Sequence, residues 1–181
     1  MSSSSVVRIV KLDANTEVQM FVDYAHHEVH AGSHYYIKNW YDIAGSGTVK
    51  EFILTTPDST KEVHLLTAFN TEAEFTLSAF EGVTTSDDGD AITPINNNRN
   101  SSKTSVLSTF EDPTVTNDGD AIWTIKMGSG GNKSTGERRG DAEIILKQNT
   151  KYLFRITKNA TGTDWVDINL KWYEHTPKNP L

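Results

Sequence analysis

Length, composition and charge exclude several classes of protein. The chain has 181 residues, 36% of them hydrophobic, which suits one domain that buries a core without covalent cross-links. It has no cysteine, so disulfides and thiolate metal sites are excluded, and this composition suits assembly in a reducing cytoplasm. No apolar run reaches the roughly 18 residues of a membrane span, and residues 1–5 lack the layout of a signal peptide, so no membrane partner is expected. The net charge of −7 opposes binding to phosphate backbones, and nucleic acid is not an expected partner either.

Short segments rich in β-branched and aromatic residues recur along the chain, separated by clusters of Gly, Asn, Asp, Ser and Thr. This spacing predicts many strands and little helix. The pattern is clearest near the end of the chain, where apolar residues alternate with polar ones and predict a strand with one buried face. The apolar residues of that strand are Val166, Ile168, Leu170 and Trp172. We expect strands near residues 6–12, 18–24, 35–43, 49–55, 63–70, 74–80, 105–110, 121–127, 142–146, 152–158 and 165–173.

Many short strands with one buried face predict an all-β fold, an antiparallel β-sandwich. For a chain of this length, the jelly-roll type fits better than a smaller immunoglobulin-like domain. We place the sandwich in residues 25–181. Residues 1–24 are expected to form an extended N-terminal arm or leading strands, which become ordered against a neighbour. Polar loops are expected at 96–104 and 128–140.

Two segments nearly repeat one another: FEGVTTSDDGDAITPI at 80–95 and FEDPTVTNDGDAIWTI at 110–125 are identical at nine of sixteen positions. Each predicts the end of a strand, a turn on Asp-Gly and a new strand, because Gly89 and Gly119 can adopt the positive φ that hairpin turns need. If both turns lie at one end of the sandwich, that end and the Asn-rich loop between them would form a partner-facing edge. The alternative is a calcium site built from carboxylates, but the complete calcium-loop pattern with its closing Glu is missing. Its candidate ligands are Asp88, Asp90, Asp118 and Asp120.

A second metal alternative lies in the segment HHEVHAGSH at 26–34. Its neighbours are rich in strand-forming residues, so we expect an extended chain in which His26, Glu28 and His30 share one face. Imidazole and carboxylate ligands suit zinc or iron. Ordinary polar residues at a strand edge or subunit contact are the favoured interpretation, and we expect no metal and no cofactor.

Enzymatic activity is not expected. The chain has no Gly-x-Ser-x-Gly motif, and GSGGNKST at 128–135 departs from a phosphate-binding loop because Asn132 stands where the second Gly belongs. Four aromatic residues offer an alternative function, since flat rings can stack on sugars, although such residues usually lie in a core or an interface. They are Trp40, Tyr41, Trp172 and Tyr173.

Three motifs together resemble a family of tailed-bacteriophage virion proteins: INNNRNSSKTS at 95–105, DAEIILKQNTKYLFRIT at 141–157 and LKWYEHT at 170–176. The family shares an Asn-Arg-Asn-Ser loop, an Ile-Leu-Lys-x-Asn-Thr-x-Tyr strand pair and a terminal Trp-Tyr-Glu-His. The segment HHEVHAGSHYYIK at 26–38 is similar to the family's opening strand, so the resemblance covers residues 25–176.

The resemblance implies a jelly-roll protein of the virion that decorates or cements the capsid surface, after assembly in the host cytoplasm. The expected partners of such a protein are the major capsid protein and two further copies of the same chain in a homotrimer. The alternative is an adhesive domain of a tail fibre or spike that binds host glycan. The polar loops supply the candidate partner-binding residues, which are Asn96, Asn97, Asn98, Arg99, Asn100, Arg138 and Arg139.

Overall fold

The computed structural model describes residues 9–11, 17–19, 24–128, 138–139 and 143–177. Within these residues the chain forms strands and one short helix, and all strand pairs are antiparallel. The elements are β1 (Ile9–Lys11), β2 (Glu17–Gln19), α1 (Tyr24–Ala31), β3 (His34–Ala44), β4 (Val49–Thr55), β5 (Glu62–Thr71), β6 (Phe75–Glu81), β7 (Thr84–Asp87), β8 (Asp90–Ile92), β9 (Ile95–Asn96), β10 (Ser108–Glu111), β11 (Thr114–Asn117), β12 (Asp120–Met127), β13 (Arg138–Arg139), β14 (Ile144–Leu146), β15 (Lys151–Lys158) and β16 (Thr163–His175).

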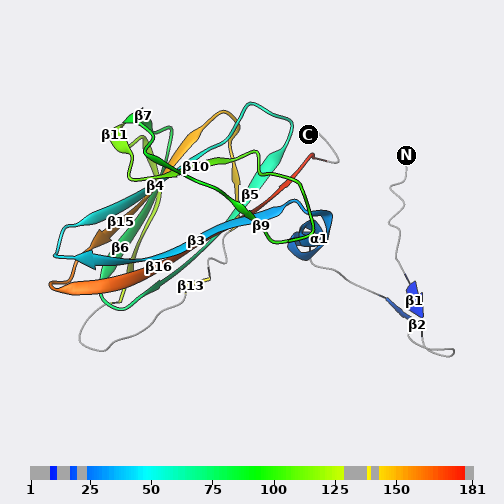
Figure 1. Ribbon diagram of the computed structural model, residues 1–181, viewed down its shortest axis with the longest axis horizontal. Coiled ribbons are helices and arrows are strands. Elements are labelled where there is room, and N and C mark those ends of the chain that lie inside the picture. Colours follow the sequence, from blue (N-terminus) through cyan, green and yellow to red (C-terminus); the bar gives the residue numbers. More distant parts are fainter. Residues whose placement is uncertain (1–8, 12–16, 20–23, 129–137, 140–142, 178–181) are drawn as a thin grey trace.

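Two large sheets pack face to face and form a sandwich (Figure 1). Sheet I has the order β12-β6-β15-β4-β10-β8. Sheet II has the order β13-β5-β16-β3-β9, and β14 also pairs with β5. The chain crosses between the sheets at successive long strands, from β3 in sheet II to β4 in sheet I, then to β5 and back to β6. The prediction of an all-β antiparallel sandwich is confirmed.

The hydrophobic core lies between the two sheets and takes alternate residues from their strands. In β16 the predicted apolar face is buried, since Val166, Ile168, Leu170 and Trp172 are at most 2% exposed. Because side chains alternate along a strand, the residues between them point to the outer face of sheet II. Phe52 and Leu54 of β4 and Phe154 and Ile156 of β15 fill the core from sheet I.

The two copies of the near-repeat form one interlocked unit. The first copy runs from the end of β6 through β7 into β8, and the second from β10 through β11 into β12. Glu81 pairs with Asp120 and Glu111 pairs with Asp90, so the strand that enters each copy pairs with the strand that leaves the other. β7 and β11 pair with one another. They lie over the outer face of sheet I and enclose a second small core around Ile53, Leu153 and Val83 (Figure 1).

Glycine is required in both turns of this unit. Gly89 and Gly119 have φ angles of +88° and +75°, as the sequence predicts. A Cβ on Gly89 would lie 2.1 Å from the carbonyl oxygen of Glu111, and a Cβ on Gly119 would lie 2.1 Å from that of Glu81. The glycines therefore supply both the backbone conformation and the space for the other copy to approach.

The strand expected at residues 26–30 is wrong, because this segment forms helix α1. The helix ends in a Schellman motif: the amide of Ser33 donates to the carbonyl of Glu28, and that of Gly32 donates to Val29. Gly32 has a φ angle of +70°, so it terminates the helix and does not interrupt a strand. The β-rich segment that follows is strand β3, and it begins only after this cap.

The Asn-rich loop does not lie at one edge of the sandwich with the two Asp-Gly turns. The partner-facing edge that the sequence suggested for the loop and both turns is therefore not formed. The loop packs on α1, since the side-chain amide of Asn98 donates to the carbonyl of His30 at 3.1 Å and Lys103 Nζ donates to that of Ala31 at 2.8 Å. β7 and β11 lie away from α1 and β9 (Figure 1).

The beginning of the chain contributes a separate ribbon. β1 and β2 pair with one another and overlap the strands expected at 6–12 and 18–24, and Figure 1 shows them apart from the sandwich. Most of the expected loop at 128–140 lies outside the described residues. In the part of the chain that the structure covers, no helix has both the length and the apolar character needed to cross a membrane.

Candidate functional site

The outer face of sheet II carries an aromatic groove, which we call the Trp40 surface, formed by Lys38, Trp40, Trp165 and Asp167. β3 and β16 place them together because Trp40 pairs with Asp167 across the two strands, and side chains two residues apart share a face. Trp40 is 61% exposed, the largest value among the exposed large hydrophobic side chains of the described residues. Lys38 Nζ lies 3.6 Å from a carboxylate oxygen of Asp167, so an ion pair borders the rings.

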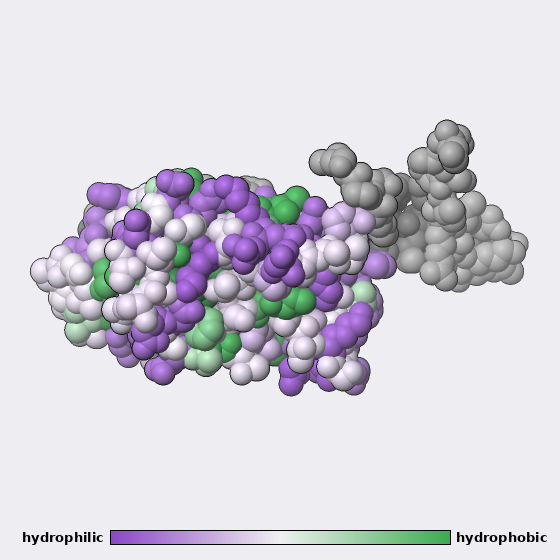
Figure 2. All heavy atoms as spheres, turned by 90° about the horizontal axis from the view of Figure 1, so that it is seen from above, coloured by the Kyte–Doolittle hydropathy of each residue, from purple (hydrophilic) through white to green (hydrophobic). Residues whose placement is uncertain are grey.

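Elsewhere the exposed hydrophobic side chains are scattered. Figure 2 shows one face of the molecule, on which hydrophilic residues predominate and hydrophobic residues form small separate patches. Isolated apolar side chains are normal on protein surfaces. A tryptophan that is exposed in the middle of a strand, beside a second tryptophan, is unusual and indicates a contact surface. The Trp40 surface is therefore the main candidate for contact with a partner.

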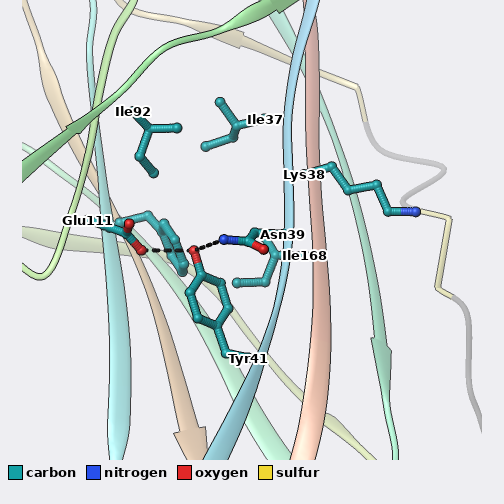
Figure 3. A pocket seen from close by; sticks show the side chains of 8 residues that line it. Ile37, Lys38, Asn39, Tyr41, Ile92, Glu111 and Ile168 are labelled. Carbon is teal, nitrogen blue, oxygen red and sulfur yellow. Dashed lines mark hydrogen bonds between the residues drawn. The ribbon is translucent and has the colours of Figure 1, made fainter.

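A second hollow lies near Tyr41 and Glu111, but it is a structural site (Figure 3). The Tyr41 hydroxyl donates to Glu111 Oε2 at 2.8 Å and accepts from the side-chain amide of Asn39 at 3.2 Å. Lys50 Nζ lies 2.8 Å from Glu111 Oε2 and 4.5 Å from the centre of the Tyr41 ring. Burial, together with the hydrogen bond to Glu111, raises the pKa of the Tyr41 phenol.

These contacts join β3 of sheet II to β10 and β4 of sheet I at one side of the core. The hollow has a volume of about 70 Å³, far below the roughly 300 Å³ or more of ligand sites, so it suits a few water molecules. The network therefore stabilises the packing of the two sheets.

The Asn-rich loop is held by its own asparagines. The Asn96 amide is buried and donates to the carbonyls of Gly32 and Lys103 at 3.0 and 3.1 Å. The Asn97 amide donates to Nδ1 of His34 at 2.7 Å, which fits the lowered pKa that burial gives this imidazole.

The candidate partner-binding residues of this loop thus divide into two groups. Asn96, Asn97 and Asn98 fix the loop against α1 and β3, while Arg99 and Asn100 are exposed. Arg138 and Arg139 form β13, which pairs with Phe69 and Ala68 at the edge of sheet II. A role for Arg138 and Arg139 in binding a partner stays a prediction.

The aspartates considered for calcium are not brought together by the structure. Asp88 is paired with Lys151 and Asp118 with Arg155, so each carboxylate already has a cation. Asp90 and Asp120 are exposed and begin two strands on opposite edges of sheet I. The interlocked turns thus use Asp88 and Asp118 in folding.

The expected face of His26, Glu28 and His30 does not form, because α1 is a helix. His26 and His30 lie one turn apart with their Nε2 atoms 3.1 Å from one another, while Glu28 is 5% exposed and turns toward the protein. The expected sugar platform is also divided. Trp172 and Tyr173 are buried, and of the four aromatic residues considered only Trp40 is largely exposed.

One group of metal-ligating side chains was missed in the sequence. Glu62 and His64 of β5 meet His175 at the end of β16, and these form the one group of three or more such side chains in the described residues. Glu62 and His64 show the two-residue spacing of a strand face, but only the pairing of β5 with β16 brings in His175. Sequence spacing alone could not reveal that contact.

Comparison with known proteins gives no family for this chain. No protein-family model matches it, and no curated protein matches it significantly. The class that the described residues define is an all-β protein with an antiparallel two-sheet sandwich.

Proposed function

We propose that the protein is a virion structural protein that binds the outside of a tailed-bacteriophage capsid and stabilises the shell of major capsid protein. The strand order supports this proposal. Sheet II contains the order β3-β16-β5-β14 and sheet I the order β4-β15-β6-β12, and these two four-stranded sets are compatible with the eight strands of a jelly roll. Jelly rolls occur in viral capsid proteins. Of the three motifs that resemble phage virion proteins, one includes β14 and most of β15, another includes the end of β16, and the third covers β9 and part of the loop after it.

The observation that carries the proposal is the Trp40 surface. Interfaces draw most of their binding energy from a few large side chains, among which Trp, Tyr and Arg are the most frequent. Trp40 and Trp165 provide such side chains, and the Lys38–Asp167 ion pair provides the polar border that surrounds a typical interface core. Burial of Trp40 against a partner would remove from water a ring that this chain leaves 61% exposed.

Stabilisation of the shell would follow from mass action. A protein that binds the assembled shell, and not its opened form, shifts the equilibrium toward the assembled state. The exposed part of the Asn-rich loop, Arg99 and Asn100, would add polar contacts at the border of such an interface. We also propose a homotrimer as the assembled form, as the resemblance to phage virion proteins implies.

The test is co-sedimentation of the purified chain with shells of the major capsid protein from the same genome, prepared without a decoration protein. The wild-type chain is expected to pellet with the shells, and Trp40→Ala to bind at least about 30-fold more weakly, as loss of a central aromatic side chain costs 2 kcal/mol or more. Val49→Ala is the matched control, because Val49 is 47% exposed but lies in sheet I. Absence of wild-type binding would overturn the proposal, and equal binding by Trp40→Ala would remove the role of the Trp40 surface.

A second candidate function is favoured by the same groove. Two tryptophan rings beside a lysine and an aspartate can stack on a sugar and bind its hydroxyls, as an adhesive fibre or spike domain would require. A glycan array separates the two functions. A decoration protein should show no selective glycan, whereas an adhesin should show one that Trp40→Ala no longer binds.

A further inference from the structure

We infer that Glu62, His64 and His175 form a binding site for one divalent transition-metal ion, with zinc as the best match. This inference goes beyond the proposed virion function and does not depend on it. The three residues lie on the outer face of sheet II, where β5 and β16 pair His175 with Glu62 and Tyr173 with His64. Two imidazoles and one carboxylate are ligands that zinc prefers, and three protein ligands leave a position open for water.

The distances between the ligand atoms fit a single ion. His64 Nε2 lies 2.8 Å from His175 Nε2, and Glu62 Oε2 lies 3.8 Å from the first and 3.9 Å from the second. For a triangle with these sides, one point in its plane is about 2.1 Å from all three atoms, within the roughly 2.0 to 2.2 Å at which zinc binds nitrogen and carboxylate oxygen. The three ligand atoms are therefore close enough together for one ion to contact all of them.

The contacts of His64 favour the tautomer that binds metal. Glu143 contacts Nδ1 of His64, and a proton on Nδ1 would satisfy this carboxylate and leave the lone pair of Nε2 for the proposed ion. The hydroxyl of Tyr173 donates to the same carboxylate of Glu143. A carboxylate behind a ligating histidine is the usual outer partner in zinc sites, because it orients the ring and makes it a stronger base.

Aromatic contacts hold the two imidazoles in place. The Tyr173 ring stacks on His64 with centroids 4.5 Å apart, and the Tyr24 ring meets the edge of His175 at 5.3 Å. Nδ1 of His175 is buried and has no hydrogen-bond partner among the described residues. The other ring nitrogen, Nε2, forms a hydrogen bond with Nε2 of His64. An ion between the two Nε2 atoms would replace that contact by two metal–nitrogen bonds, with the proton of His175 moving from Nε2 to Nδ1.

The site is accessible to an ion from solvent. The side chains of His64, His175 and Glu62 are 12%, 17% and 36% exposed. The competing location is the His26–His30 pair of α1, where two imidazoles one turn apart could also bind zinc. Any test must therefore distinguish these two histidine groups.

The test is isothermal titration calorimetry of the full purified chain with zinc chloride, after dialysis against a chelator. The wild-type chain and the double variant His26→Ala/His30→Ala are expected to bind one zinc each with similar affinity. His175→Ala and Glu62→Gln should lose this binding. Glu143→Gln should bind about 10- to 100-fold more weakly, because it removes only the outer partner of His64.

Two results would overturn the inference: no zinc binding by the wild-type chain, or loss of binding in His26→Ala/His30→Ala with binding retained in His175→Ala. Circular dichroism of each variant checks that it is folded. If His175→Ala fails to fold, Glu62→Gln gives the decisive comparison, because Glu62 is the most exposed of the three ligands. In the wild-type chain, added zinc should also raise the melting temperature, and this rise should be absent in Glu62→Gln.

Discussion

Arg155 holds Asp118 with two parallel hydrogen bonds, from Nη1 to Oδ2 at 2.6 Å and from Nη2 to Oδ1 at 2.7 Å. Lys151 holds Asp88 at the equivalent position of the other copy, with one hydrogen bond from Nζ to Oδ1. Both cations lie on β15, and both aspartates directly precede the glycine of an Asp-Gly turn. The central strand of sheet I therefore anchors both copies of the near-repeat.

These ion pairs predict a pH dependence of stability. The hydrogen bonds from Arg155 and Lys151 lower the pKa of Asp118 and of Asp88 below the ordinary value of 3.8. A carboxyl group whose pKa is lower in the folded state contributes stability above its unfolded pKa and loses it as pH falls through the folded pKa. The free energy of unfolding, measured by urea denaturation, should therefore fall as pH drops below 3.8.

The variant Asp118→Asn tests this origin. At neutral pH it should be less stable by about 0.5 to 1 kcal/mol, the usual range for a partly exposed ion pair, and its loss of stability in acid should be smaller than that of the wild type. Asp58→Asn is the control, because it removes an exposed carboxylate from the loop between β4 and β5, far from Asp118 in the sequence. An acid profile of Asp118→Asn that coincides with that of the wild type would contradict the prediction.

The close approach in the interlocked turns predicts a large effect of one methyl group. Gly119→Ala should lower the free energy of unfolding by about 3 kcal/mol or more, because it combines a left-handed backbone with a Cβ that meets a carbonyl oxygen. Gly47→Ala is the matched control, because Gly47 has a φ angle of +84° but nothing lies near its Cβ position. It should lose only about 1 to 2 kcal/mol. Equal losses, measured by chemical denaturation, would show that the approach of the two copies is not tight.

A buried cation predicts a second effect on stability. Lys158 is fully buried, and its Nζ donates to the carbonyls of Ile43 and Gly162 and lies 2.6 Å from Asp164. Removal of the Asp164 charge would leave this ammonium group without its counter-ion, so Asp164→Asn should lose about 2 to 4 kcal/mol.

The control for this variant is Asp167→Asn, on the same strand. Asp167 is about as exposed as Asp164, but its partner Lys38 is 53% exposed, so the loss should stay below about 1 kcal/mol. Thermal unfolding of the two variants side by side gives the comparison. Similar melting temperatures would show that loss of the counter-ion costs no more for the buried Lys158 than for the exposed Lys38.

The Asn-rich loop predicts a separation of folding from binding. Asn96→Ala should lose about 1 to 3 kcal/mol of stability, because it removes the two hydrogen bonds that the buried Asn96 amide donates to the carbonyls of Gly32 and Lys103. Asn100→Ala should leave stability unchanged, since this residue is exposed. If the loop borders the capsid interface, Asn100→Ala should weaken binding to shells while its melting temperature stays that of the wild type. If Asn100→Ala binds shells as tightly as the wild type, the exposed part of the loop has no role in binding.

The strands of the sandwich could be predicted from the sequence because their signal is local. Alternation in residues 165–173 specifies which side chains are buried, and the structure buries them. The sequence does not predict helix α1, because the segment is rich in histidine and is followed by the strand-forming residues of β3. The role of Gly32 as a helix terminus depends on the Schellman hydrogen bonds to Val29 and Glu28.

The sites could not be predicted because they depend on pairing between distant strands. Trp40 and Trp165 meet through the register of β3 with β16, and His64 meets His175 through that of β5 with β16. Nothing in local spacing specifies a register between strands so far apart in the chain. The near-repeat shows the same limit, since two similar turns were expected but their interlocking was not.

The proposed role of this protein as a component of the capsid shell is tested most directly by its copy number per purified virion, measured by quantitative mass spectrometry against the major capsid protein. We predict a number comparable to that of the major capsid protein or a simple fraction of it, as expected for a protein that covers the shell. A copy number matching the few copies of a tail or fibre protein, or absence from the virion, would contradict it.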